Sequence, residues 1–241
     1  MNPPIFYGIT DLPLPETISR ETGLPSYIIN DASAGALAEN IYGRTKNRED
    51  ILYVHIMGGI GVGYILKHQV YDGTSGKSGE IGHTSINFAG PLCDCGNAGC
   101  LEVYANIENI NAKINDMKEI YNVSSSLPAS DKPYTFSEVI NAAENSDIYA
   151  ISALDDFCGY LSQALTNTIN LFDIHHIIVG YDSYQSETII EKILYEKLNS
   201  NIASAKHRHI SVEKSIYGGS APLIGSIALV TSKLFDGIWV F

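Results

Sequence analysis

The chain has 241 residues, of which 45% are hydrophobic and 17% charged, so the composition predicts a folded globular protein and excludes a disordered tail. A formal net charge of −12 argues against binding to a nucleic-acid backbone. No apolar stretch approaches the roughly 20 residues that span a bilayer, and the first residues lack the pattern of a signal peptide. Three of the four cysteines lie within eight residues, which favours a metal site and a reducing, cytoplasmic setting over disulfides.

The first part of the chain predicts two helices and a short strand. Apolar positions and a glycine stop predict a helix over residues 11–24. The β-rich run at residues 26–29 predicts a strand. A second helix follows over residues 32–39, and either Asn30 or Asp31 would lie near its N-cap.

The middle of the chain predicts a hairpin and long loops. Residues 51–56 form an apolar run typical of a strand, and residues 61–66 would be its hairpin partner. Glycine and serine predict a loop over residues 72–82, and the cysteines lie in a second loop over residues 88–100. The polar stretch 122–132 is the best candidate for a flexible insert.

The second half alternates helices with strands. Apolar residues spaced by three or four positions predict a long helix over residues 148–169. After it we expect a strand at 176–180, a helix at 186–199, a strand at 210–216 and a final helix at 222–234. This alternation predicts an α/β architecture.

One loop carries four candidate metal ligands: His83, Cys93, Cys95 and Cys100. Three thiolates and one imidazole suit tetrahedral zinc, and four protein ligands would make the zinc structural. The alternative is three cysteines and an unrelated histidine, because Cys-x-Cys with a distant histidine is not the usual ligand spacing. Cys158 lies in the predicted long helix, where we expect a buried free thiol.

Two neighbouring motifs are distinctive. They are Gly79-Glu80-Ile81-Gly82-His83 and the run from Cys93 to Glu102. Three further segments lie around them along the chain: Asn30-Asp31-Ala32, the glycine-rich stretch 59–63 and Asn170–Asp173. In these motifs and in their order, from about Phe6 to the C-terminus, the chain resembles the ROK family of sugar kinases and sugar-responsive transcriptional repressors. The resemblance implies that the histidine and three cysteines bind zinc.

The resemblance implies an actin-like ATPase fold, with a ribonuclease-H-like second lobe. Residues 46–219 would form this lobe nearly completely. Residues 1–45 would be a remnant of a truncated first lobe, and residues 220–241 would contain a final helix that packs back on it. An unpaired sheet edge and an uncovered apolar face would favour self-association, so we expect a homo-oligomer, most simply a dimer.

The resemblance further implies a sugar site formed by Asn30, Asp31, Glu80, His83 and Glu102. Carboxylates and amides can accept from and donate to adjacent sugar hydroxyls. The histidine would bind metal through one ring nitrogen and offer the other to the sugar. The alternatives are solvated surface carboxylates for the two glutamates and a helix cap for Asn30 and Asp31.

Two functions follow from the resemblance. The first is the sugar-sensing effector and oligomerisation domain of a ROK regulator, which would bind DNA only through a domain outside this chain. The alternative is a ROK-type sugar kinase, truncated or degenerate, with ATP and Mg²⁺ as cofactors. Asp31 would then be the general base, and Gly59, Gly61 and Gly63 would contact the nucleotide.

Three departures from the kinase pattern favour the regulator. The chain has no Asp-x-Gly-x-Thr turn that could cradle phosphate. The hairpin contains Met57-Gly58-Gly59, so it lacks the threonine hydroxyl that the kinases place there. Tyr181 and Asp182 follow the strand at 176–180, where we expect them to crowd and repel a nucleotide. We therefore expect a protein that binds a small sugar or sugar phosphate, without a membrane partner.

Overall fold

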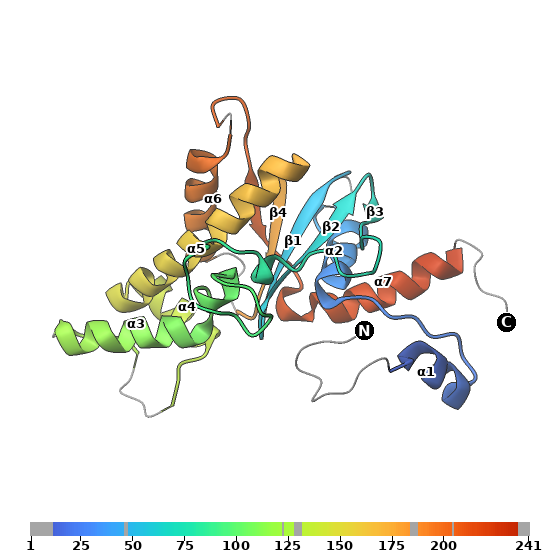
Figure 1. Cartoon of the computed structure of the whole chain (residues 1–241), viewed down its shortest axis with the longest axis horizontal. Helices are drawn as coiled ribbons and strands as arrows, with labels where there is room; N and C mark the ends of the chain where they lie inside the picture. The colour runs from blue at the N-terminus through green and yellow to red at the C-terminus, as the bar shows by residue number, and fades with distance from the viewer. Residues whose placement is uncertain are drawn as a thin grey trace.

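The computed structural model describes residues 12–45, 48–121, 123–127, 132–183, 188–203 and 205–235. Its centre is a five-stranded sheet in the order β3-β2-β1-β4-β5 (Figure 1). The strands are β1 (Ile51–Ile56), β2 (Ile60–Leu66), β3 (Gln69–Val70), β4 (His176–Gly180) and β5 (Ser211–Lys214). The first three strands are antiparallel neighbours, whereas β1, β4 and β5 run parallel.

The described part of the chain contains seven α-helices. They are α1 (Leu14–Thr22), α2 (Asp31–Ile41), α3 (Ile107–Ile120), α4 (Phe136–Glu144), α5 (Ile148–Phe172), α6 (Ile189–Asn201) and α7 (Ala221–Phe235). Three short 3₁₀ turns, η1 (Ile81–His83), η2 (Leu101–Val103) and η3 (Gly218–Ser220), lie in the loops. The described helices are too short or too polar to cross a membrane.

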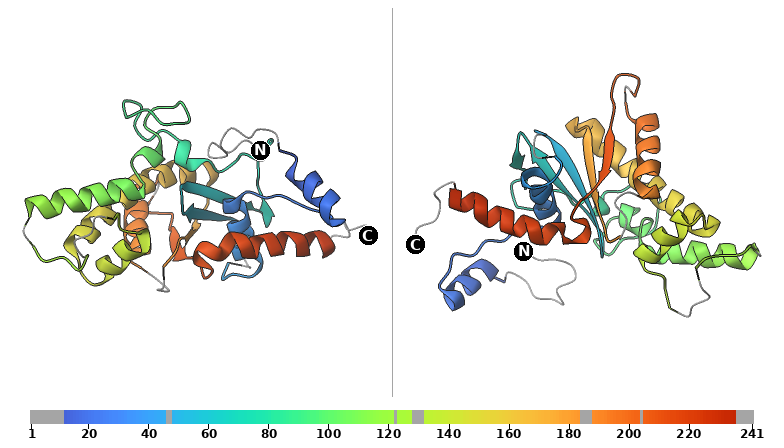
Figure 2. Two further views of the ribbon diagram at one scale, coloured as in Figure 1. Left: turned by 90° about the horizontal axis from the view of Figure 1, so that it is seen from below. Right: turned by 180° about the vertical axis from the view of Figure 1, so that it is seen from behind.

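Both faces of the sheet are covered, which explains why β1 is apolar along nearly all its length. Leu52 and Val54 face the large core beneath α5 and α6, whereas Ile51 and Tyr53 face α2 (Figures 1 and 2). Every residue of β1 is buried. A strand covered on both sides shows a continuous apolar run instead of alternation.

Helix α2 lies between the sheet and α7, and small residues make this close packing possible. A Cβ at Gly63 of β2 would lie 2.1 Å from the carbonyl oxygen of Ala32, and one at Gly225 of α7 would lie 1.8 Å from that of Ala34. A Cβ at Gly35 would lie 2.2 Å from the Tyr53 ring. The first turn of α2 is therefore held directly against the β1–β2 hairpin.

The strand predicted at residues 26–29 is wrong. Residues 25–30 form no strand, and Tyr27 and Ile28 are exposed. β-prone side chains need a neighbouring strand to exchange backbone hydrogen bonds, and this run has none among the described residues. The other predicted strands and helices are confirmed, with ends shifted by a few residues.

The insert predicted at 122–132 is only partly described, because residue 122 and residues 128–131 lie outside the described residues. In the described part, the Ser125 hydroxyl and the Ser126 N–H each donate to the Asp147 carboxylate at 2.7 Å. Asp147 also caps α5. This part of the insert is therefore tied to the start of the long helix.

The close approach of α2 and β2 gives the first prediction. Gly63→Ala should lower the free energy of unfolding by about 1–3 kcal/mol, because the added methyl group has no room beside Ala32. Gly58→Ala, in the hairpin turn with no atom within 4 Å of its Cβ position, is the matched control and should change stability by no more than ~0.5 kcal/mol. Equal urea midpoints for the two variants would contradict this packing.

Candidate functional site

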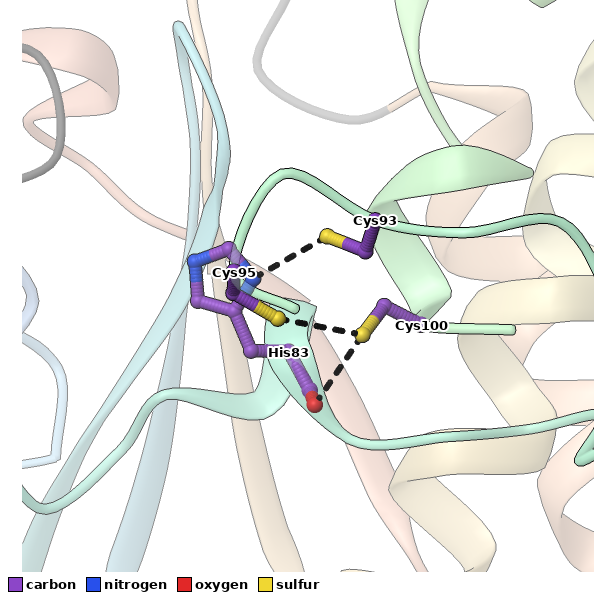
Figure 3. Close-up of side chains that lie close together, drawn as sticks. All are labelled: His83, Cys93, Cys95 and Cys100. Carbon is purple, nitrogen blue, oxygen red and sulfur yellow. Dashed lines mark hydrogen bonds between the residues drawn. The ribbon is translucent and has the colours of Figure 1, made fainter. Parts of the chain in front are cut away.

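The four predicted metal ligands come together in the cysteine loop, residues 83–100 (Figure 3). His83 lies on η1 and Cys100 directly precedes η2, whereas Cys93 and Cys95 lie between them. Their ligand atoms all lie within 4.8 Å of one another. Nδ1 of His83 is 3.7 Å from Sγ of Cys93, and Sγ of Cys95 is 3.6 Å from Sγ of Cys100.

Backbone hydrogen bonds fold this loop onto itself. Cys93 N–H donates to Asn97, and Gly96 N–H donates back to Cys93, at 2.8 and 2.9 Å. Gly96 and Gly99 have φ angles of 91° and 66°, which side chains disfavour. The sequence thus builds a tight turn that points three thiols and an imidazole at one point, a donor set able to hold a metal ion. Cys158 is fully buried in α5 and belongs to the apolar core, as predicted.

Glu102 connects the cysteine loop to the sheet. Its Oε1 accepts a 2.8 Å hydrogen bond from the backbone N–H of Ile60, at the start of β2. Its Oε2 lies 4.0 Å from Nε2 of His83. Because the side chain is only 30% exposed and is bonded to the hairpin, the alternative of a solvated surface carboxylate is wrong for Glu102. Glu80, by contrast, is exposed.

The start of α2 approaches the same hairpin. Asn30 is its N-cap, since Oδ1 accepts from the N–H groups of Ala32 and Ser33 at 2.9 and 3.3 Å. Oδ1 of Asp31 also accepts from Ala32, at 2.8 Å, and the Asp31 side chain is 64% exposed. Asn30 therefore caps the helix, and Asp31 presents its carboxylate beside the hairpin.

Sequence reasoning missed His55, the second-last residue of β1. Nε2 of His55 lies 3.8 Å from Oδ2 of Asp31, although the histidine side chain is only 10% exposed. Burial lowers the pKa of His55, and the nearby carboxylates of Asp31 and Asp182 only partly oppose this effect. The sequence signal for this residue is that His55 is the single strongly polar side chain within the apolar run of β1.

Tyr181 does not block a nucleotide, so that part of the prediction is wrong. Its side chain is fully buried, and its hydroxyl bonds with Thr188 and Glu191 at 2.7 and 2.6 Å. The residue after β4 turns into the core because α6 packs there. Asp182 is exposed, with Oδ1 close to Gly219.

The glycines predicted to contact a nucleotide all have close protein neighbours. A Cβ at Gly59 would lie 2.7 Å from Oε1 of Glu102, and one at Gly61 would lie 3.4 Å from Cβ of Ala32. Gly63 faces the same helix turn, as described above. Packing therefore accounts for the glycines at 59 and 63, whereas position 61 has room for a Cβ in ordinary van der Waals contact.

The Glu102 hydrogen bond gives the second prediction. Glu102→Ala should lower the free energy of unfolding by about 1–3 kcal/mol, because it leaves the buried N–H of Ile60 without its acceptor. Glu102→Gln keeps an acceptor oxygen and should recover most of the loss. The exposed Glu80 is the control, and Glu80→Ala should stay within ~0.5 kcal/mol in the same denaturation experiment. Equal losses for the two alanine variants would contradict the assigned bond.

Comparisons with known proteins agree with this architecture. The sequence model of the ROK family matches residues 1–233. The chain is 33% identical over 228 residues to the xylose repressor of Bacillus subtilis, which covers 95% of this chain and 56% of the repressor. A solved ROK family transcriptional regulator, a homologue of the Escherichia coli MLC protein, has a TM-score of 0.81 and 29% identity over 95% of this chain and 57% of that one.

A ROK family glucokinase from Streptomyces griseus, solved with glucose and AMPPNP, has a TM-score of 0.75 and 25% identity over 90% of this chain and 72% of that one. The chain thus spans a little over half the length of the regulators that it matches. Its fold is of the actin-like ATPase type. The match over residues 1–233 shows that the chain belongs to the ROK family.

Proposed function

We propose that this chain is the sugar-sensing effector and oligomerisation part of a ROK-family transcriptional regulator. The observation that carries the proposal is the meeting of two polar segments at the β1–β2 hairpin. Glu102 is bonded to Ile60 at the start of β2, and Asp31 lies beside His55 near the end of β1. The similarity to the xylose repressor over 95% of the chain supports a regulator. DNA would be bound by a domain outside the chain.

The chemistry around the hairpin suits a ligand rich in hydroxyl groups. Asp31, Glu80 and Glu102 offer carboxylate oxygens that accept hydrogen bonds, and Asn30 and His83 lie next to them in the sequence or the fold. Asp31 and Glu80 are largely exposed, so a bound sugar would need a second wall to exclude water. We propose that residues 46–219 form the second lobe of the fold. Residues 1–45 and 220–241 would belong to the first lobe, which would supply this second wall.

For the cysteine loop we propose one structural zinc ion, bound by His83, Cys93, Cys95 and Cys100. The four ligand atoms already lie within 4.8 Å of one another, and their chemistry fits zinc. Bound zinc would hold the loop that carries Glu102 and would leave no open position for catalysis. Zinc binding needs reduced thiols, in keeping with a cytoplasmic protein.

The second candidate function is a ROK-type sugar kinase using ATP and Mg²⁺. It is favoured by the structural likeness to the Streptomyces glucokinase and by the exposed carboxylate of Asp31, which could serve as a general base. Against it, Gly58 in the hairpin turn offers no hydroxyl to a phosphate, and the Cβ side of Gly63 packs directly against α2. We therefore place it second.

We also propose that the protein forms a homodimer. Along the outer face of α7, apolar side chains are 42–67% exposed at Leu223, Ile227, Val230 and Leu234. The opposite face of this helix packs on α2. Exposed apolar stripes of this kind are typical of association surfaces.

Sugar binding gives the third prediction. Isothermal titration with D-xylose, hexoses, N-acetylhexosamines and their 6-phosphates should identify one sugar that binds. Asp31→Ala should weaken its binding by about 1–3 kcal/mol, the range for losing a hydrogen-bond partner in a desolvated site. Asp116→Ala, an exposed aspartate on α3, is the matched control and should bind as the unchanged protein does. Equal affinity in both variants would rule out the Asp31 assignment.

The same sugars separate the two functions in a coupled ADP-release assay. A regulator should show turnover far below the ~1 per second at the low end of ordinary enzymes. Turnover near that value, abolished by Asp31→Ala, would establish the kinase instead.

The metal gives the fourth prediction. Protein purified without chelator should carry about one zinc per chain in elemental analysis. Cys95→Ser should lose most of this zinc, because it removes one of four ligands, whereas Cys158→Ser should retain it. Zinc absent from the unchanged protein, or equally retained by the two variants, would rule out the proposed site.

A further inference from the structure

His55 lies directly beneath the Asp31 carboxylate. In the sheet its two neighbours are Gly61 on β2 and Gly180 on β4, so no side chain flanks the imidazole across the strands. The ring stacks on Tyr53 with centroids 6.1 Å apart and an interplanar angle of 24°. The strand thus fixes the ring in place below the first turn of α2.

Asp31 has one oxygen in a hydrogen bond and the other near His55. Oδ1 accepts from the backbone N–H of Ala32 at 2.8 Å, and Oδ2 lies 3.8 Å from Nε2 of His55. The Asp31 side chain is 64% exposed and that of His55 only 10%. A ligand would therefore reach the carboxylate from the solvent side, while the histidine lies on its protein side.

The second ring nitrogen of His55 identifies the tautomer. Nδ1 is buried and has no hydrogen-bond partner among the described residues. A proton on Nε2 points toward the Asp31 carboxylate, whereas a proton on Nδ1 would have no acceptor. The neutral ring with its proton on Nε2 is therefore the favoured form.

We propose that His55 is a positioning residue for the sugar site: its neutral Nε2–H group orients the Asp31 carboxylate toward a ligand hydroxyl, and protonation of the ring weakens ligand binding. An imidazolium would draw Oδ2 of Asp31 into an ion pair and compete with the hydroxyl for the same oxygen. It would also place a buried proton on Nδ1 without an acceptor. This inference rests on the proposed sugar-binding function.

The charged groups around the ring set the pH range. Asp31 faces it from α2 and Asp182 from the segment after β4, and both carboxylates favour the protonated form. Burial outweighs them and holds the pKa of His55 below its ordinary value of 6.5. The ring is therefore mostly neutral at pH 7 and takes up its proton at a lower pH than an ordinary imidazole does.

The test compares His55→Gln, which keeps a neutral donor, with His55→Leu, which has none. Each protein is titrated with D-xylose, D-glucose and N-acetylglucosamine at pH 7.5, 6.5 and 5.5, with zinc content measured at each pH. The unchanged protein should lose affinity between pH 7.5 and 5.5, by no more than about tenfold, because the pKa of His55 is lowered from 6.5. His55→Gln should bind within about threefold of the unchanged protein at pH 7.5 and show a flatter pH profile, and His55→Leu should bind about tenfold more weakly there. A His55→Gln profile as steep as that of the unchanged protein, or full affinity in His55→Leu, would overturn the proposal.

A second measurement does not depend on sugar. Nitrogen-15 NMR of the imidazole should show the Nε2–H tautomer at pH 7.5, and Asp31→Asn should lower the pKa of His55 further by removing a neighbouring negative charge. An Nδ1–H tautomer, or a pKa unaffected by Asp31→Asn, would overturn the pairing. If the unchanged protein binds neither these sugars nor any other of the wider panel in the third prediction, the proposed function fails, and this measurement alone decides whether His55 and Asp31 interact.

Discussion

The hydrogen bond from the Ile60 N–H group to the Glu102 carboxylate joins the two halves of the candidate site. At 2.8 Å it fastens the end of the cysteine loop to the first residue of β2. The other carboxylate oxygen lies beside His83, one of the four candidate metal ligands. A metal ion held by the loop would therefore fix the position of Glu102, and Glu102 would fix the loop against the sheet. A surface carboxylate without these neighbours would lose rotamer freedom when it binds a sugar, and this loss would oppose binding. The Glu102 side chain has already lost much of that freedom, so less of it opposes binding here.

The other side of the site depends on how closely α2 packs. Glycine at position 63 lets the carbonyl of Ala32 touch β2, and glycine at position 225 lets α7 touch α2. This packing brings the N-terminus of α2 to the hairpin, where Asn30 caps it and Asp31 lies above His55. The helix N-terminus and the cysteine loop are far apart in sequence, and the β1–β2 hairpin is the element that both contact. The sheet thus positions the site, and the loops supply its chemistry.

Much of this arrangement could be predicted from the sequence, and the failures have physical causes. The strand runs were recognisable because a strand covered on both faces is continuously apolar, as in β1. The four candidate metal ligands were recognisable from residue type together with the resemblance to the ROK family, because their spacing alone left an alternative open. The run 26–29 was misassigned because β-propensity does not reveal whether a partner strand exists. Tyr181 was misassigned because side-chain direction at the end of a strand depends on the packing of α6. His55 was missed because only the fold brings it beneath Asp31.

The central claim is that a metal-held loop and the hairpin form one sugar site. The most direct test is calorimetric titration of the sugar that binds, before chelation, after chelation and after zinc is restored, with the folded state checked by circular dichroism. We expect that a folded, metal-free protein loses sugar affinity, because Glu102 is no longer held in place, and that zinc restores it. Equal sugar affinity in the zinc-bound and the folded metal-free protein would contradict it.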